Sequence, residues 1–218
     1  GSVSLFAKIN TNPLEYYAIK AIVKEGIISH IQNEIDIMAK LNHPSLCKLY
    51  GVYRDNSTLT FSLLLPYFPK GSLDKCIKDD IRGSPPEWWT ITKKMKALYG
   101  IAAGMQYMHQ NGTFHRDLKP GNVLLDDNYE VKISDFGLSK PYQINSENTL
   151  NIGTPLYLPP EMIQGDNKYS LKVDVYSFGI MMYVILLGKS PYPWLSAMKI
   201  CIHVLQGGRP RVDSDFPF

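Results

Sequence analysis

His115-Arg116-Asp117-Leu118-Lys119-Pro120-Gly121-Asn122 is the most specific pattern in this sequence, and Asp135-Phe136-Gly137 follows it downstream. A lone Asp-Phe-Gly recurs by chance in unrelated proteins, whereas the eight-residue string is specific. Between the two, the apolar runs Val123-Leu124-Leu125 and Val131-Lys132-Ile133 predict a pair of short strands. The strings in this order, with a strand pair between them, are far more specific than either string alone.

The pattern of apolar residues along the chain changes after Pro66. Apolar residues alternate in much of the first part, which is typical of strands, and recur at helical spacing in much of the second. A β-rich front and a helical back joined by a short linker predict two lobes with a ligand-binding cleft between them. The expected elements are a hairpin within residues 1–23 that turns at 10–13, strands over 46–53 and 58–65, and helices over 27–41, 92–110 and 173–187.

The composition is that of an ordinary globular protein: 44% of the residues are apolar, 20% are charged and the formal net charge is +3. A charge this small and scattered does not indicate nucleic-acid binding. Three widely spaced cysteines (Cys47, Cys76, Cys201) predict unpaired thiols in a reducing compartment. No signal peptide is recognisable, and the most apolar stretch, 175–187, is shorter than the roughly 20 residues that span a bilayer. We therefore expect a cytoplasmic protein without membrane insertion.

The two strings resemble the catalytic-loop and metal-binding motifs of eukaryotic protein kinases. The resemblance implies the α+β, bilobal kinase fold, with a β-rich N-lobe that contains one main helix and a mostly helical C-lobe. It places the N-lobe at 1–65, the hinge at 66–73 and the C-lobe at 74–218, with the domain truncated at both ends. The implied activity is transfer of the γ-phosphate of ATP to a protein substrate, with Mg²⁺ as the cofactor.

The same resemblance implies roles for residues in the helical half. Asp117 would accept the proton of the substrate hydroxyl and orient that hydroxyl, and Lys119 would contact the transferred phosphate. Asn122 and Asp135 would bind Mg²⁺, which prefers hard oxygen ligands. Asp174, at the start of an apolar helix, would accept hydrogen bonds from the backbone of the catalytic loop.

In the β-rich half, Tyr17-Ala18-Ile19-Lys20 resembles the kinase strand motif Val-Ala-Ile-Lys, so Lys20 would pair with the α- and β-phosphates. Its partner should be a glutamate on the next helix. Glu34 fits the register of the family, whereas the competing Glu25 is expected to precede the helix.

The resemblance also implies the other nucleotide contacts. Gly1 would be the third glycine of the phosphate-covering loop and Val3 the valine that packs on adenine, while the first two glycines and the strand before them are missing. In the hinge, Leu65 would be a gatekeeper that narrows the back pocket, the Pro66 carbonyl would accept a hydrogen bond from the adenine amine, and the Phe68 N–H would bond a ring nitrogen. The implied ATP-binding residues are completed by Ala18, Lys20, Glu34, Leu124 and Asp135.

Two features favour serine and threonine as acceptors. Leu118-Lys119-Pro120 follows the catalytic aspartate as it does in Ser/Thr kinases, and Gly153-Thr154-Pro155 resembles their substrate-binding segment. In that family the threonine matched by Thr154 bridges the catalytic aspartate and lysine. Gly71-Ser72-Leu73, among other stretches, further resembles the tyrosine-kinase-like branch.

Regulation is expected in the activation loop, residues 138–152. By resemblance, Arg116 would receive a phosphorylated residue of this loop through charge-assisted hydrogen bonds. The candidate residues, modified by an upstream kinase or by autophosphorylation, are Ser139, Ser146 and Thr149.

Two other functions are compatible with parts of the pattern. A pseudokinase would keep the fold and act as a nucleotide-binding scaffold or allosteric module. A small-molecule phosphotransferase of related fold is the second. Such enzymes lack an activation segment, so the segment that closes here at Pro159-Pro160-Glu161 argues against this function. In the family this glutamate pairs with an arginine that has no counterpart here, so we expect residues 1–218 alone to be unstable or inactive and the full-length protein to be competent.

Overall fold

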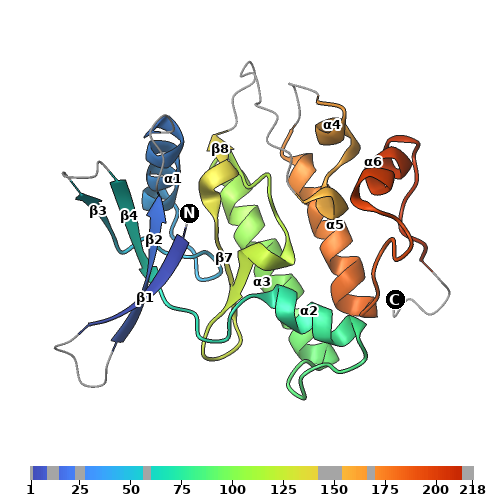
Figure 1. Ribbon diagram of the computed structural model, residues 1–218, viewed down its shortest axis with the longest axis horizontal. Helices are drawn as coiled ribbons and strands as arrows, with labels where there is room; N and C mark the ends of the chain where they lie inside the picture. Colours follow the sequence, from blue (N-terminus) through green and yellow to red (C-terminus); the bar gives the residue numbers. More distant parts are fainter. Residues whose placement is uncertain are drawn as a thin grey trace.

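The computed structural model describes residues 2–8, 15–22, 28–55, 60–141, 154–165 and 170–212. It places a sheet and one helix on one side of the molecule and most of the helices on the other (Figure 1). The two sides are connected through residues 67–72, directly after the last strand of the sheet.

The sheet has four antiparallel strands in the order β1-β2-β4-β3. The strands are β1 (Ser2–Lys8), β2 (Glu15–Ile22), β3 (Gly51–Asp55) and β4 (Thr60–Pro66). The predicted hairpin at the start of the chain is confirmed as the β1–β2 pair. Its register places Val3 opposite Lys20, and the β2–β4 register places Ala18 opposite Leu65. Residues directly opposite each other lie on the same face of a sheet, as do residues two positions apart in a strand, so Ala18, Lys20 and Leu65 share one face.

Helix α1 (Ile28–Lys40) lies beside this sheet (Figure 1). It confirms the helix predicted over 27–41 within the described residues. Its buried side chains, Glu34, Ile37 and Met38, recur at helical spacing and therefore share one face. The helix contacts the short 3₁₀ turn η2 (Phe136–Leu138) and the short strand β8 (Lys140–Pro141) of the other half. Glu34 is thus directed toward the junction of the two halves.

The strand predicted over 46–53 is wrong in its first part, because β3 begins only at Gly51. Leu46 instead forms an isolated parallel bridge with Ile133 in the helical half. The Cys47 N–H donates to the Ile133 carbonyl at 2.7 Å, and the Ile133 N–H donates to the Ser45 carbonyl at 2.7 Å. The apolar residues at 46–49 belong to a connection that joins the two halves, and an apolar run alone does not distinguish this from a strand.

The second half is built on two long helices, α3 (Ile91–Gln110) and α5 (Lys172–Leu187), which contact each other. Both confirm predicted helices. The elements around them are α2 (Leu73–Ile81), α4 (Pro160–Ile163), α6 (Ala197–Leu205), the 3₁₀ turns η1 (Pro120–Asn122) and η3 (Pro155–Tyr157), and the short strands β5 (Thr113–Phe114), β6 (Val123–Leu125) and β7 (Val131–Ile133). The strand pair predicted between the two motifs is confirmed as the antiparallel pair β6–β7.

Helix α5 is apolar around most of its circumference and ends at Gly188, whose φ of +59° suits glycine. Its buried residues include Val173, Met181 and Ile185, and the latter two belong to a core that also contains residues of α1, α2 and α3. Within the described ranges, the structure contains no helix long and apolar enough to cross a membrane.

Candidate active site

Lys20, Glu34 and Asp135 come from three distant parts of the chain and meet at one point. The Nζ atom of Lys20, on β2, lies 2.8 Å from Oε1 of Glu34 on α1 and 2.9 Å from Oδ1 of Asp135. Glu34 is only 5% exposed, whereas the Asp135 side chain is half-exposed. A buried glutamate requires such a partner, because an unpaired buried charge is costly. The pairing predicted for Lys20 with Glu34, rather than Glu25, is therefore formed; Glu25 lies outside the described residues.

The surroundings of Lys20 and Asp135 favour the charged form of each. Burial alone would lower the pKa of Lys20, but attraction to Glu34 and Asp135 outweighs it, so this pKa lies above its ordinary value. Burial alone would raise the pKa of Asp135, but Lys20 outweighs it and holds this pKa below its ordinary value. At neutral pH, the site therefore presents an ammonium group beside an ionised carboxylate.

The backbone of Asp135 is strained, and the packing of the next residue holds it in place. Its φ is +65°, an unfavourable conformation for a residue with a Cβ. The next residue, Phe136, is buried beside His115, with the ring centroids 5.7 Å apart. The His115 ring is also tied to the Ser134 carbonyl, with Nε2 at 3.0 Å. Strain of this kind persists only where the surroundings fix it, and it concentrates at functional sites.

The loop 115–122 brings Asp117, Lys119 and Asn122 together. The Nζ atom of Lys119 donates to Oδ2 of Asp117 at 2.6 Å, and Nδ2 of Asn122 donates to the same oxygen at 2.9 Å. Nδ2 of Asn122 also donates to the Asp117 carbonyl at 2.8 Å, so the oxygen of this amide faces away from Asp117. Ser134 donates to the Asn122 carbonyl through both its N–H and its Oγ, which joins the loop to the residue before Asp135.

Asp174, at the start of α5, holds this loop from behind. Its Oδ2 accepts the His115 N–H and its Oδ1 accepts the Arg116 N–H, both at 2.8 Å. These are the loop contacts that the sequence predicted for Asp174. The same Oδ2 also lies 2.9 Å from Nε2 of His109, a contact that was not predicted.

A cavity of about 430 Å³ opens between the sheet and the helical half, beside Lys20 and Asp135. Its lining includes nine predicted nucleotide or metal contacts: Ala18, Lys20, Glu34, Leu65, Pro66, Phe68, Asn122, Leu124 and Asp135. The cavity thus combines apolar walls with a charged end, which is typical of sites for small polar ligands. Five lining residues were not predicted as contacts, namely Met38, Cys47, Tyr67, Gly121 and Ser134.

Several predicted residues lie elsewhere or cannot be placed. Thr154 is exposed, and in the described part of the chain its hydroxyl forms no hydrogen bond with Asp117 or Lys119. Ser139 is buried, and its Oγ donates to the His115 carbonyl at 3.3 Å. This burial argues against Ser139 as a phosphorylation site, because a modifying kinase needs access to the hydroxyl. The residues outside the described side chains are Gly1, Val3, Ser146 and Thr149.

Arg116, predicted to receive a phosphorylated residue, is buried. Its guanidinium carbon lies 5.8 Å from the centre of the Phe114 ring. Its φ is +71°, which places a second strained residue directly before Asp117. The role predicted for its side chain stays a prediction.

Comparison with known proteins gives one consistent result. A family profile described as "Protein kinase domain" matches residues 1–210. A protein named as a serine/threonine-protein kinase/receptor of Acanthamoeba polyphaga mimivirus is 36% identical over 92% of this chain, and one named as a serine/threonine-protein kinase of Dictyostelium discoideum is 34% identical over 90%. The NUAK family SNF1-like kinase 1 of Mus musculus is 36% identical over 80% of the chain. The chain spans only 12%, 21% and 26% of the lengths of these three relatives.

Proposed function

The chain belongs to the protein kinase domain family, and on this basis we propose that it transfers the γ-phosphate of ATP to serine or threonine hydroxyls of a protein substrate. The observation that carries the proposal is the position of Lys20 between Glu34 and Asp135 at the end of the cavity. A lysine held by a buried glutamate presents fixed positive charge to phosphate oxygens. Phosphoryl transfer depends mainly on such positioning and charge neutralisation.

The cavity suits the nucleotide as a substrate. Its apolar walls, which include Ala18, Leu65 and Leu124, would enclose the adenine ring. The Phe68 N–H has no acceptor among the described residues, so it would be free to donate to the ring. The Pro66 carbonyl would accept from the adenine amine, and Lys20 would face the phosphates. In this arrangement residues 1–65, 66–73 and 74–218 act as N-lobe, hinge and C-lobe.

The donor set beside the phosphates fits Mg²⁺. Asp135 offers an ionised carboxylate with one oxygen bonded to Lys20, and Asn122 offers the amide oxygen that faces away from Asp117. Mg²⁺ is commonly bound by one or two protein oxygens together with substrate phosphates and water. When bound, it would neutralise charge that develops on the phosphates. Asn122 and Asp135 are its proposed ligands.

Asp117 would act on the acceptor hydroxyl. Its Oδ2 is occupied by Lys119 and Asn122, so the second carboxylate oxygen is the one placed to accept the hydroxyl proton. Lys119 also reduces repulsion between the Asp117 carboxylate and the incoming phosphate. The preference for serine and threonine rests on Lys119, on the predicted role of Thr154 and on the names of the relatives. Placement in the tyrosine-kinase-like branch stays a prediction.

The test is transfer of labelled γ-phosphate to a peptide mixture with serine, threonine and tyrosine acceptors. We expect the full-length wild-type protein to label serine and threonine, and its Asp117→Asn variant to lower kcat by about 10³-fold while ATP still binds, because only acceptor activation is removed. Exclusive labelling of tyrosine would contradict the acceptor assignment. Binding of ATP without any transfer by the wild type would instead indicate a pseudokinase.

A further inference from the structure

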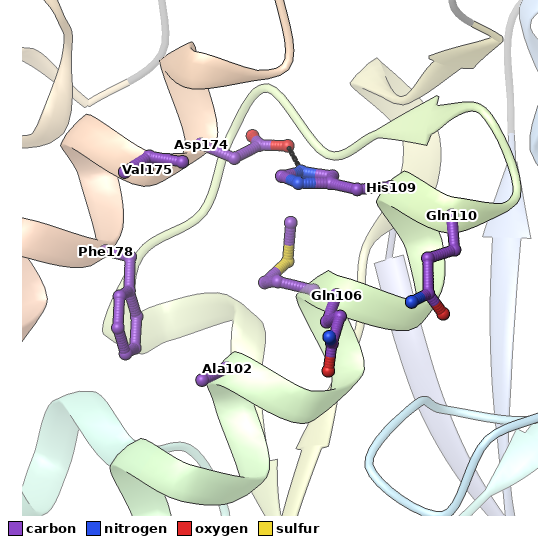
Figure 2. Close-up of a pocket in the computed structure, with 8 residues that line it drawn as sticks. Ala102, Gln106, His109, Gln110, Asp174, Val175 and Phe178 are labelled. Atoms are coloured by element: carbon purple, nitrogen blue, oxygen red, sulfur yellow. Dashed lines mark hydrogen bonds and ion pairs between the residues drawn. The ribbon is translucent and has the colours of Figure 1, made fainter.

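Two further cavities lie in the described part of the chain. The first, of about 550 Å³, lies between α3 and α5, and Figure 2 shows His109 reaching toward Asp174 on its wall. That carboxylate is already occupied by His109 and by the catalytic loop. The second, the tyrosine cavity of about 600 Å³, borders the hinge and is lined by four tyrosines, two prolines and Asp127. Asp127 and three of these tyrosines do not line the nucleotide cavity, so they are available for another function.

The topology of the sheet gathers the four tyrosines at one end of it. Tyr16 and Tyr17 lie at the start of β2. Tyr50 directly precedes β3, and Tyr67 directly follows β4. Because β4 lies between β2 and β3 and runs antiparallel to both, these three strand ends are neighbours. Asp127 comes from the turn between β6 and β7, so the tyrosine cavity spans both halves of the molecule.

The tyrosine rings form an exposed aromatic surface. The ring centroids of Tyr16 and Tyr67 lie 6.4 Å apart with 57° between the ring planes. Those of Tyr17 and Tyr50 lie 5.8 Å apart at 72°. Tyr16, Tyr50 and Tyr67 are 49%, 53% and 39% exposed, and within the described ranges their hydroxyls form no hydrogen bond. Exposed rings with unused donors are typical of surfaces that a protein partner covers.

The charge of the cavity restricts the chemistry of that partner. Asp127 is exposed, is the one charged residue among the described residues of the lining, and has no ion-pair partner among them. It would attract a basic side chain and repel a nucleic acid or an anionic membrane. The apolar face of a helix is unsuitable too. Its carbonyl groups bond within the helix, so the covered tyrosine hydroxyls would be left without acceptors.

An extended proline-rich segment satisfies both the rings and the hydroxyls. In the polyproline II conformation the backbone carbonyls have no internal bonds, so the tyrosine hydroxyls would donate to them. Such segments dock in aromatic-lined grooves, and because the conformation is largely preformed, little ordering entropy is lost. We propose that the tyrosine cavity binds a proline-rich segment of a protein partner, with a basic residue of that segment beside Asp127. This binding does not depend on phosphoryl transfer.

The test measures the binding of labelled peptides to the full-length protein by fluorescence anisotropy. The probe is a peptide of about ten prolines with an arginine at each end, which forms about three turns of polyproline II helix. A second peptide carries glutamine in place of arginine, and a third carries the arginines on a flexible glycine-serine chain of equal length. We expect saturable binding of the first, about threefold weaker binding of the second and at least about tenfold weaker binding of the third.

Variants of the lining residues assign the binding to the tyrosine cavity. We expect Tyr50→Ala to weaken binding of the arginine–proline peptide about tenfold, and Tyr50→Phe, which keeps the ring and removes the hydroxyl, to weaken it about threefold. Tyr99→Ala is the matched control and should bind as wild type, because Tyr99 is 78% exposed on α3 and lies outside the cavity. Asp127→Asn should weaken the arginine–proline peptide about threefold and leave the glutamine peptide unchanged.

The proposal fails if the arginine–proline peptide shows no saturable binding, or if it binds Tyr50→Ala and wild type equally. Equal binding of the flexible arginine peptide would assign the site to a cation alone and would overturn the proposal as well. So would self-association of the wild type that Tyr50→Ala abolishes, measured by sedimentation, since the occupant would then be a second copy of the protein. Should Tyr50→Ala not fold, Tyr16→Ala is expected to show the same tenfold loss, and wild-type binding in that variant refutes the proposal.

Discussion

At the residue scale, the neighbours of Lys20 determine its protonation state. Lys20 keeps its proton because two carboxylates lie within 2.9 Å of its Nζ atom, although burial by itself favours the neutral amine. Since its pKa is raised on folding, Lys20 stabilises the fold below its unfolded pKa, and this contribution disappears as the pH rises through its folded pKa. The ion pair therefore operates fully at neutral pH.

Cys47 lines the same cavity but has the opposite response to burial. Burial raises the pKa of its thiol to about 12, and the nearby Lys20 charge offsets only part of this effect. On the order of 10⁻⁴ of such a thiol is ionised at pH 8, and the thiolate is the reactive form. We expect iodoacetamide at pH 8 to alkylate the partly exposed Cys201 well before the buried Cys47 and Cys76, as followed by mass spectrometry.

The control for this alkylation experiment is the chain unfolded in guanidinium chloride, where all three cysteines should react at similar rates. Native Cys47 that reacts as fast as Cys201 would contradict the burial of the cavity wall.

At the scale of elements, α3 approaches β7 closely because glycines lie at the contact. A Cβ at Gly100 would lie 2.5 Å from Cγ2 of Val131, and one at Gly104 would lie 2.9 Å from Cδ1 of Ile133. Both partners are buried, and the β-branched Val131 has few alternative rotamers. These glycines set the distance between α3 and the strand that leads to Asp135.

Gly100→Ala should therefore destabilise the protein although alanine is the better helix former. We expect a loss of about 1–3 kcal/mol from overpacking against Val131, which exceeds the gain of up to about 1 kcal/mol from helix propensity. Gly179→Ala is the matched control, because Gly179 lies inside α5 and a Cβ there would meet nothing within 4 Å. That substitution should stabilise the protein by about 0.5–1 kcal/mol. Urea unfolding midpoints measure both effects, and equal shifts for the two variants would contradict the close packing of α3.

The elements that the sequence predicted well are those with a long or regular pattern. The first hairpin, α1 and α3 have apolar residues at a regular spacing, and α5 is marked by a long apolar run. Helices α2 and α6 have nine residues each and were expected only as part of a mostly helical half, since short patterns carry little periodic signal. The strand predicted over 46–53 failed because Leu46 and Cys47 bond to Ile133 instead of continuing the sheet.

At the scale of the whole molecule, the fold assembles a site from residues that the sequence keeps far apart. Family resemblance predicted the Lys20–Glu34 pair and named Asp135 separately, and the fold places both carboxylates within hydrogen-bonding distance of Lys20. The contact of His109 with Asp174 was not predicted, because no local pattern marks a histidine whose partner lies 65 positions away. The walls contributed by Cys47 and Met38 were missed for the same reason.

Phosphoryl transfer in the cavity beside Lys20 and Asp135 is the activity proposed for the molecule as a whole. The most direct test compares labelled γ-phosphate transfer by the full-length wild-type protein and by its Asp135→Asn variant, with ATP binding measured in both. We predict transfer by the wild type in the presence of Mg²⁺ and a fall of at least about 10²-fold in Asp135→Asn, because a neutral amide holds the cation poorly. An Asp135→Asn chain that transfers phosphate at the wild-type rate would contradict this proposed activity of the site.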